Sequence, residues 1–198
     1  KDEYGGSLEN RMRVMRLVIT EVMQAAGNDI AVVVKTNMYD GFKGGMTQPE
    51  CIQVAKTLEQ LGVHALVLSA GFVSKAPMAV MHGAMPIKTL AHYMDMKSFW
   101  WLKLGLHVAG KWMIPTVPFT EAYFLEEAKQ FRAELSLPLI YVGGLVSRTK
   151  IDEVLNSGFE LVQMARALVH DPAFVNNMKE SDQTYRNGCK HSNYCIAR

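Results

Sequence analysis

Residues 137–144 read Leu-Pro-Leu-Ile-Tyr-Val-Gly-Gly, an apolar run that ends in two glycines, and a helical pattern follows from Ser147. A short apolar run, a turn and then a helical pattern are typical of one βα unit of a parallel sheet. The arrangement recurs along the chain and predicts an α/β fold. The expected strands are residues 30–36, 64–69, 137–142 and 160–164. Each is nearly continuous in apolar residues, as is typical of strands covered on both faces.

Helical patterns alternate with these strands. The expected helices run from Ser7 to about Ala26, from Thr47 to about Leu61, from Thr120 through Ala128, from Ser147 to about Gly158, and from Asp171-Pro172 onward. The second is marked most clearly, because Thr47 and Glu50 form a capping-box pattern with Pro49 in the first turn. Strand and helix therefore alternate along most of the chain.

Such βα units fit two architectures, an open doubly wound sheet or half of an eight-stranded closed barrel. Periodicity alone leaves both open. A half-barrel would leave two strand edges and one sheet face uncovered, so we expect it to need a partner half. Residues 72–119 interrupt this alternation, because Met, Trp, Gly and Pro residues stand there without clear periodicity. The segment is also longer than ordinary βα loops.

Composition excludes several classes of protein. The 198 residues are 49% hydrophobic and 20% charged, enough for one sizeable core. The net charge of +2 is spread along the chain, which argues against a nucleic-acid partner. No apolar run approaches the roughly 20 residues of a membrane span. Three cysteines favour a reducing, cytoplasmic setting. Because the chain opens at Lys1 in a helix-launching stretch, we expect both ends to be truncated.

Four segments carry a resemblance to a known family. They are Asp2-Glu3-Tyr4-Gly5-Gly6-Ser7-Leu8-Glu9-Asn10-Arg11, residues 139–144 (LIYVGG), residues 161–168 (LVQMARAL) and Asp171-Pro172. In this order they resemble the Old Yellow Enzyme and 2,4-dienoyl-CoA reductase family of NADH:flavin oxidoreductases. The resemblance implies a TIM (β/α)8 barrel that binds FMN, of which residues 1–180 supply the second half, strands five to eight. Residues 181–198 would begin a truncated tail that contains cysteines.

Gly143, Gly144, Ala165 and Arg166 form the candidate phosphate site. Phosphate sites of such barrels are commonly built by the loops after strands seven and eight. Glycines let backbone N–H groups approach a phosphate, and an arginine adds a fork of charged donors. The family pattern has Gly where Ala165 stands, but the backbone N–H remains available. Without the surrounding motifs, Gly-Gly would be interpreted as a tight turn and Arg166 as a solvated charge.

Lys35 lies inside an expected strand, where a charge is costly unless it faces a polar barrel centre or a ligand. By resemblance, this is the position of a basic residue, often Arg, beside the pyrimidine side of the flavin. There it would stabilise the negative charge of the reduced cofactor. The alternative is a lysine at a strand end whose head group reaches solvent.

Cys189 and Cys195 resemble part of the segment by which the dienoyl-CoA reductase branch holds an iron–sulfur cluster. Ser192 stands where that branch has its second cysteine, and Cys195 falls one residue early. Two thiolates are too few for such a cluster, so we expect none in this chain. His191 could be a substitute ligand, or the segment could bind zinc, but a surface tail with incidental thiols is the commoner arrangement. Cys51 is expected to be a small core residue.

The resemblance implies an oxidoreductase in which NADH or NADPH reduces FMN and the flavin passes hydride to a small molecule, an activated alkene or enoyl compound. In the family, the proton-donating tyrosine and the carbonyl-binding histidine or asparagine pair lie on the fourth strand, upstream of Lys1. No catalytic residue is therefore assigned, and this chain alone is expected to be inactive. Residues 71–119, with a Met-rich stretch and Trp100-Trp101, would cover the barrel mouth, or would pack a small core of their own.

Two alternatives remain. One is a half-barrel that binds a phosphate-bearing ligand and assembles with another chain or with its own copies. The other is a non-flavin phosphate-binding barrel, such as an aldolase, in which Lys35 would be the Schiff-base lysine. The Tyr4-Gly5-Gly6-Ser7 motif argues against the second alternative.

Overall fold

The computed structural model of this chain describes residues 2–72, 74–75, 82–84, 86–87, 116–181 and 184–197, together with positions 89, 92, 101, 104, 105 and 108. Most of the insertion predicted at residues 72–119, including its Met-rich stretch and Trp100, lies outside the described residues. Trp101 is described, and 57% of its surface is exposed.

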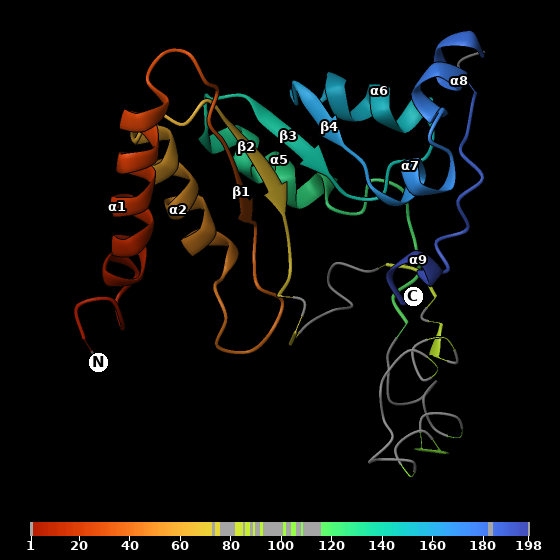
Figure 1. Cartoon of the computed structure of the whole chain (residues 1–198), viewed down its shortest axis with the longest axis horizontal. Helices are drawn as coiled ribbons and strands as arrows, with labels where there is room; N and C mark the ends of the chain where they lie inside the picture. Colours follow the sequence, from red (N-terminus) through yellow and green to blue (C-terminus); the bar gives the residue numbers. More distant parts are fainter. Residues whose placement is uncertain are drawn as a thin grey trace.

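Four parallel strands form a single sheet in the order β1-β2-β3-β4 (Figure 1). They are β1 (Val33–Asn37), β2 (Ala65–Ser69), β3 (Leu139–Val142) and β4 (Leu161–Gln163). The predicted parallel α/β architecture is confirmed, although every strand begins later than the sequence indicated. Because neighbours in the chain are neighbours in the sheet, every connection steps to the next strand, as in a barrel of successive βα units.

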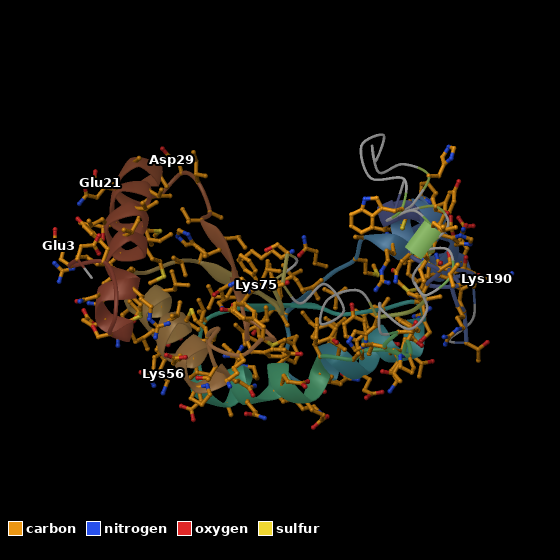
Figure 2. The ribbon with its side chains drawn as sticks, turned by 90° about the horizontal axis from the view of Figure 1, so that it is seen from below. Glu3, Glu21, Asp29, Lys56, Lys75 and Lys190 are labelled. Atoms are coloured by element: carbon orange, nitrogen blue, oxygen red, sulfur yellow. The ribbon has the colours of Figure 1, made fainter. Side chains whose placement is uncertain are left out.

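The two faces of the sheet differ. On the first face, Leu66, Leu68, Leu139 and Tyr141 are fully buried, and Figure 2 shows α2, α5 and α6 on one side of the curved sheet. On the second face, Lys35 pairs in register with Val67, which pairs with Ile140, which pairs with Leu161. At the edges of this second face Val33 is 47% exposed and Leu161 57% exposed. The open face is the one that a closed barrel would turn inward.

Three predicted helices have the boundaries that their caps indicated. They are α1 (Leu8–Ala26), α2 (Gln48–Gln60) and α6 (Arg148–Asn156). The Ser7 hydroxyl accepts from the backbone N–H of Asn10, and the Ser147 hydroxyl accepts from that of Lys150. At α2, both halves of the Thr47–Glu50 capping box are formed. No helix in the described part of the chain is long and apolar enough to cross a membrane.

Helix α5 (Leu125–Glu134) begins later than predicted, because Thr120 does not cap it. Ala122 has a left-handed backbone, with φ at 55°, which is incompatible with a continuous α-helix. The Glu121 carboxylate instead accepts from the backbone N–H groups of Val146 at 2.9 Å and Ser147 at 2.6 Å. Residues 121–124 therefore form a turn that is bound to the loop after β3.

Three short helices follow β4 in the described part of the chain: α7 (Arg166–His170), α8 (Phe174–Glu180) and α9 (Tyr194–Ala197). The helix predicted from Asp171-Pro172 is α8, which begins at Phe174. Asp171 stands in the preceding turn, where its carboxylate accepts from the backbone N–H of Ala173. Cys51 is 2% exposed, which confirms it as a core residue. Burial raises the pKa of its thiol to about 12, with Asp40 and Glu50 adding to the effect.

Candidate functional site

A pocket of about 330 Å³ lies at the carboxyl ends of the strands. Its lining residues are Lys35, Ser69, Tyr123, Phe124, Val142, Gly143, Gly144, Leu145, Gln163, Met164, Ala165, Arg166, Ala167, Val169, His191 and Cys195. Every residue predicted to hold the cofactor is in this lining. The structure therefore brings together Lys35 of β1, the glycine pair after β3, and Ala165-Arg166 after β4.

The glycine pair forms a turn into which no side chain fits. A Cβ on Gly143 would lie 2.5 Å from the Tyr141 hydroxyl. Gly144 has φ at 68°, and a Cβ there would lie 2.4 Å from the Tyr123 ring. The Tyr141 hydroxyl donates to the carbonyl oxygen of Gly143 at 3.0 Å, so the strand fixes its own turn. Only glycine fits at these two positions, because the Tyr141 and Tyr123 side chains pack directly against the backbone of the turn.

Arg166 begins α7 and directs its guanidinium group among three protein acceptors. Nη1 donates to the backbone carbonyl of His82 at 2.7 Å and to Oδ1 of Asn193 at 2.6 Å. Nη2 donates to the hydroxyl of Tyr123 at 3.3 Å. Arg166 is therefore not the freely solvated charge of the alternative interpretation, because protein groups fix its direction.

Two aromatic stacks surround this arginine. The His82 ring stacks on Tyr123 with centroids 3.9 Å apart, and the His191 ring stacks on Phe119 at 3.3 Å. Burial lowers the pKa of His82, and the nearby Arg166 lowers it further. Burial likewise lowers the pKa of His191 to about 4, with Arg166 and Arg186 adding to the effect. Both imidazoles are therefore neutral at pH 7, which leaves Arg166 as the positive charge of the cluster.

Lys35 is exposed on the open face of the sheet and lines the pocket. One layer further toward the carboxyl ends, Asn37 pairs in register with Ser69, and Val142 pairs with Gln163. Ser69 and Gln163 also line the pocket, which gives its floor hydroxyl and amide groups. Lys35 thus lies on the open face of the sheet, and its contact with a ligand stays a prediction.

The segment with Cys189 and Cys195 is docked against the pocket. Its residues His191 and Asn193 are 5% and 2% exposed, so it is not a free surface tail. Cys189 is half-buried, whereas Cys195 is exposed and lines the pocket. Among the described residues, no three His, Cys, Asp or Glu side chains are placed to hold a metal ion.

Sequence reasoning missed Tyr123, His82 and Asn193. Tyr123 was placed inside a helix, whereas the turn before α5 points its ring at Gly144. His82 and Asn193 belong to segments without periodicity, and they reach Arg166 from 84 and 27 residues away. For Asn193, the sequence offered one signal. Asparagine tolerates a left-handed backbone better than most residues, and Asn193 adopts one, with φ at 54°.

The pocket combines charged and backbone donors at one end with apolar walls. Arg166 stands beside the glycine turn, and Val142, Leu145 and Met164 supply apolar surface. A pocket with a few convergent polar groups and an apolar lining is typical of small-molecule sites. This one suits a small molecule that carries an anionic group.

Comparison with known proteins identifies the family. The family model described as the NADH:flavin oxidoreductase / NADH oxidase family matches residues 1–104. The chain belongs to this family. A 4,4'-dithiodibutanoate disulfide reductase of Rhodococcus erythropolis is 36% identical over 197 residues, which are 98% of this chain and 47% of that protein. An NADH oxidase of Thermoanaerobacter brockii is 27% identical over 197 residues, 98% of this chain and 25% of that protein.

Solved structures give the same fold. A 2-naphthoyl-CoA reductase complex superposes with a TM-score of 0.67 at 18% identity, covering 98% of this chain and 26% of that one. An old yellow enzyme homologue from Zymomonas mobilis superposes with a TM-score of 0.54 at 16% identity, covering 98% and 46%. The predicted half of a TIM barrel is confirmed. The chain spans about half the length of the R. erythropolis relative and about a quarter of the T. brockii relative.

Proposed function

We propose that this family member binds FMN in the pocket at the carboxyl ends of its strands and takes part in hydride transfer from NADH or NADPH to a small electrophile. Bound FMN would supply the redox chemistry, accepting hydride from the nicotinamide and passing it on. The observation that carries the proposal is the convergence of Lys35, the Gly143-Gly144 turn and Arg166 on one pocket. The low cysteine count supports a cytoplasmic setting.

Arg166 and the glycine turn would hold the phosphate. Both glycines of the turn line the pocket, and Gly144 has a left-handed backbone, with φ at 68°, that a side chain would strain. Backbone N–H groups of the turn and of Ala165 would donate to phosphate oxygens, and Arg166 would supply the compensating charge. These residues fit a flavin that carries a phosphate.

Lys35 would lie beside the ring. It stands on the sheet face that carries Ser69 and Gln163, at the opposite side of the pocket from the helix that Arg166 begins. A fixed positive charge beside the flavin favours the reduced, negatively charged form and so raises the reduction potential. A lysine offers one compact charge rather than the planar fork of an arginine.

Two classes of electrophile are candidates for the substrate. The first is an activated alkene or enoyl compound, as the family resemblance implies. The second is a small organic disulfide, because the R. erythropolis relative that is 36% identical is a 4,4'-dithiodibutanoate disulfide reductase. Both accept a hydride and a proton overall, so one flavin site serves either. Rates of reduction of an enone and of an aliphatic disulfide, each measured with NADH and with NADPH, would distinguish the two substrate classes.

The open sheet supports a second part of the proposal, that further barrel strands complete the site. Beyond the exposed sheet face, α1 presents a row of exposed apolar side chains, namely Val14, Leu17, Val18 and Val22. Met12, Met15, Ile19 and Met23 pack the other side of this helix into the core. A contiguous row of exposed apolar side chains on a helix is typical of a surface that another element covers. We propose that the missing half of the barrel, or another copy of the chain, covers it.

The test is a titration of FMN into the purified chain, followed by flavin fluorescence and visible absorption. Arg166→Ala removes the proposed phosphate charge, and Arg13→Ala removes an arginine of α1 that pairs with Glu3. We expect stoichiometric binding that is weakened by Arg166→Ala and unchanged by Arg13→Ala. Equal binding by both variants would contradict the phosphate assignment. A chain extended by the upstream βα units that still binds no FMN would contradict flavin binding altogether.

The alternatives make different predictions. A phosphate-binding half-barrel without flavin chemistry would bind inorganic phosphate and phosphorylated ligands but would show no flavin spectrum on assembly. An aldolase would form a Schiff base at Lys35, which borohydride would trap in the presence of a carbonyl compound. The family match favours the flavin oxidoreductase over both.

A further inference from the structure

Among the described residues, the acceptors that orient the guanidinium group of Arg166 are all neutral. These are the His82 carbonyl, the Asn193 amide oxygen and the Tyr123 hydroxyl. An arginine has five N–H donors, and these bonds use three of them. Nε and one Nη2 hydrogen have no hydrogen-bond partner among the described residues, and no described carboxylate forms an ion pair with Arg166. The side chain is thus fixed in direction, and within the described ranges no carboxylate compensates its charge.

Asn193 is itself held firmly. It is 2% exposed, and its amide nitrogen donates to the carbonyl oxygen of Ala84 at 3.0 Å. With its nitrogen bound to Ala84, its oxygen must face Arg166, at 2.6 Å. Asn193 therefore bridges the segment that carries Ala84 and the arginine.

The segment at residues 82–84 packs tightly against the segment that carries His191 and Asn193. The Ala84 N–H donates to the carbonyl oxygen of His191 at 3.1 Å, and the Gly83 N–H donates to that of Val117 at 2.8 Å. A Cβ on Gly83 would lie 2.1 Å from the His191 carbonyl oxygen. This close seating fixes Asn193 relative to the rest of the pocket, because neither segment can shift without breaking these bonds.

We propose that Asn193 is a positioning residue that directs Arg166 at the phosphate of the bound flavin. The proposal rests on the proposed function. A neutral amide orients the guanidinium group without cancelling its charge, whereas a carboxylate at the same place would neutralise it. Asn193 would therefore act on the recognition of the phosphate and leave the recognition of the flavin ring unchanged.

The experiment compares FMN with riboflavin, which has the same ring and no phosphate. Asn193→Gly removes the acceptor and suits the left-handed backbone, at φ 54°. Asn193→Asp keeps an acceptor and adds a negative charge. Ser192→Gly, at the exposed neighbour, controls for a glycine in this segment. We expect both Asn193 variants to weaken FMN binding about tenfold and to leave riboflavin binding unchanged. Asn193→Gly acts by loss of one hydrogen bond to a charged group, and Asn193→Asp acts by neutralising the charge of Arg166.

A double-mutant cycle tests whether Asn193 acts through the arginine. In an Arg166→Ala background, Asn193→Gly should have no further effect on FMN affinity. Equal losses for FMN and riboflavin, or no loss for either, would overturn the positioning role while the proposed function stands. If the unsubstituted chain binds riboflavin as tightly as FMN, or if the chain extended by the upstream βα units binds neither, the phosphate assignment falls and this inference falls with it.

Discussion

The hydroxyl of Tyr141 in β3 donates to the carbonyl oxygen of Gly143, in the turn directly after the strand, at 3.0 Å. The Tyr141 hydroxyl oxygen also accepts a hydrogen bond from the backbone N–H of Phe124 at 3.1 Å. One buried hydroxyl thus joins the end of β3 to the turn before α5, and both segments line the pocket. The conformation of the glycine turn is therefore set by the core.

Removing this hydroxyl should destabilise the fold. In Tyr141→Phe, the Phe124 N–H and the Gly143 carbonyl lose a partner in a buried setting, and we expect a loss of about 1–3 kcal/mol in the free energy of unfolding. Urea denaturation measures it. Tyr185→Phe is the control, because that half-buried hydroxyl donates to Asp171 at 3.3 Å and should cost less. Equal losses in the two variants would show that the Tyr141 hydroxyl contributes no more to the free energy of unfolding than the Tyr185 hydroxyl does.

A glycine comparison separates backbone strain from steric conflict. Gly144→Ala places a Cβ 2.4 Å from the Tyr123 ring at a backbone φ of 68°. Gly44→Ala meets a similar φ, 84°, with nothing within 4 Å. We expect Gly44→Ala to cost about 1–2 kcal/mol from backbone strain, and Gly144→Ala to cost more and to weaken FMN binding. Similar stability losses in the two variants would mean that the Tyr123 ring moves aside freely.

The pH dependence of stability should report His191. Its folded-state pKa of about 4 lies below the value of about 6.5 expected in the unfolded chain. Above pH about 6.5 its contribution is fully present, and it is lost as the pH falls toward about 4, because the unfolded state takes up the proton first. The urea concentration at the midpoint of unfolding should therefore be lower at pH 5 than at pH 7.5.

Substitution identifies the group responsible for that fall. His191→Gln should narrow the difference between the two midpoints, because its side chain does not titrate. Ser192→Ala, at the exposed neighbour, should keep the difference of the unsubstituted chain. An unchanged pH difference in His191→Gln would show that another group causes it.

Lys35 and Arg166 should affect different parts of the flavin. Lys35→Ala should weaken riboflavin and FMN alike and make the reduction potential of the bound flavin more negative, because a positive charge beside the ring is lost. Arg166→Ala should weaken FMN alone. Calorimetric titration with both flavins, and a potentiometric titration of the bound form, measure these effects. A Lys35→Ala variant with unchanged potential would place the lysine head group in solvent.

The sequence predicted the scaffold because its signals are local. Apolar runs marked the strands, and Ser7, Thr47 and Ser147 marked helix starts through bonds that span only three residues. The start of α5 was missed because Glu121 bonds to Val146 and Ser147, a long-range interaction that overrides the expected helix. Only the fold brings such residues together.

The site divides in the same way. Gly143, Gly144, Ala165 and Arg166 could be named as candidates because they follow strands, and strand ends meet at one edge of a parallel sheet. His82, Tyr123 and Asn193 were not found, since their contacts with Arg166 join segments that are distant in the chain. The loop at 82–84, the turn at 121–124 and the tail at 187–195 meet at Arg166 only in the folded chain.

Phosphorus NMR of FMN tests the central claim most directly, because it observes the phosphate itself. Upon addition of one equivalent of the chain, or of the chain assembled with the other barrel half, the account predicts a shifted resonance for bound phosphate. Arg166→Ala should return that resonance toward the position of free FMN. A phosphate resonance that stays at the free position while the flavin fluorescence reports binding would contradict the account, since the ring would then be bound with its phosphate in solvent.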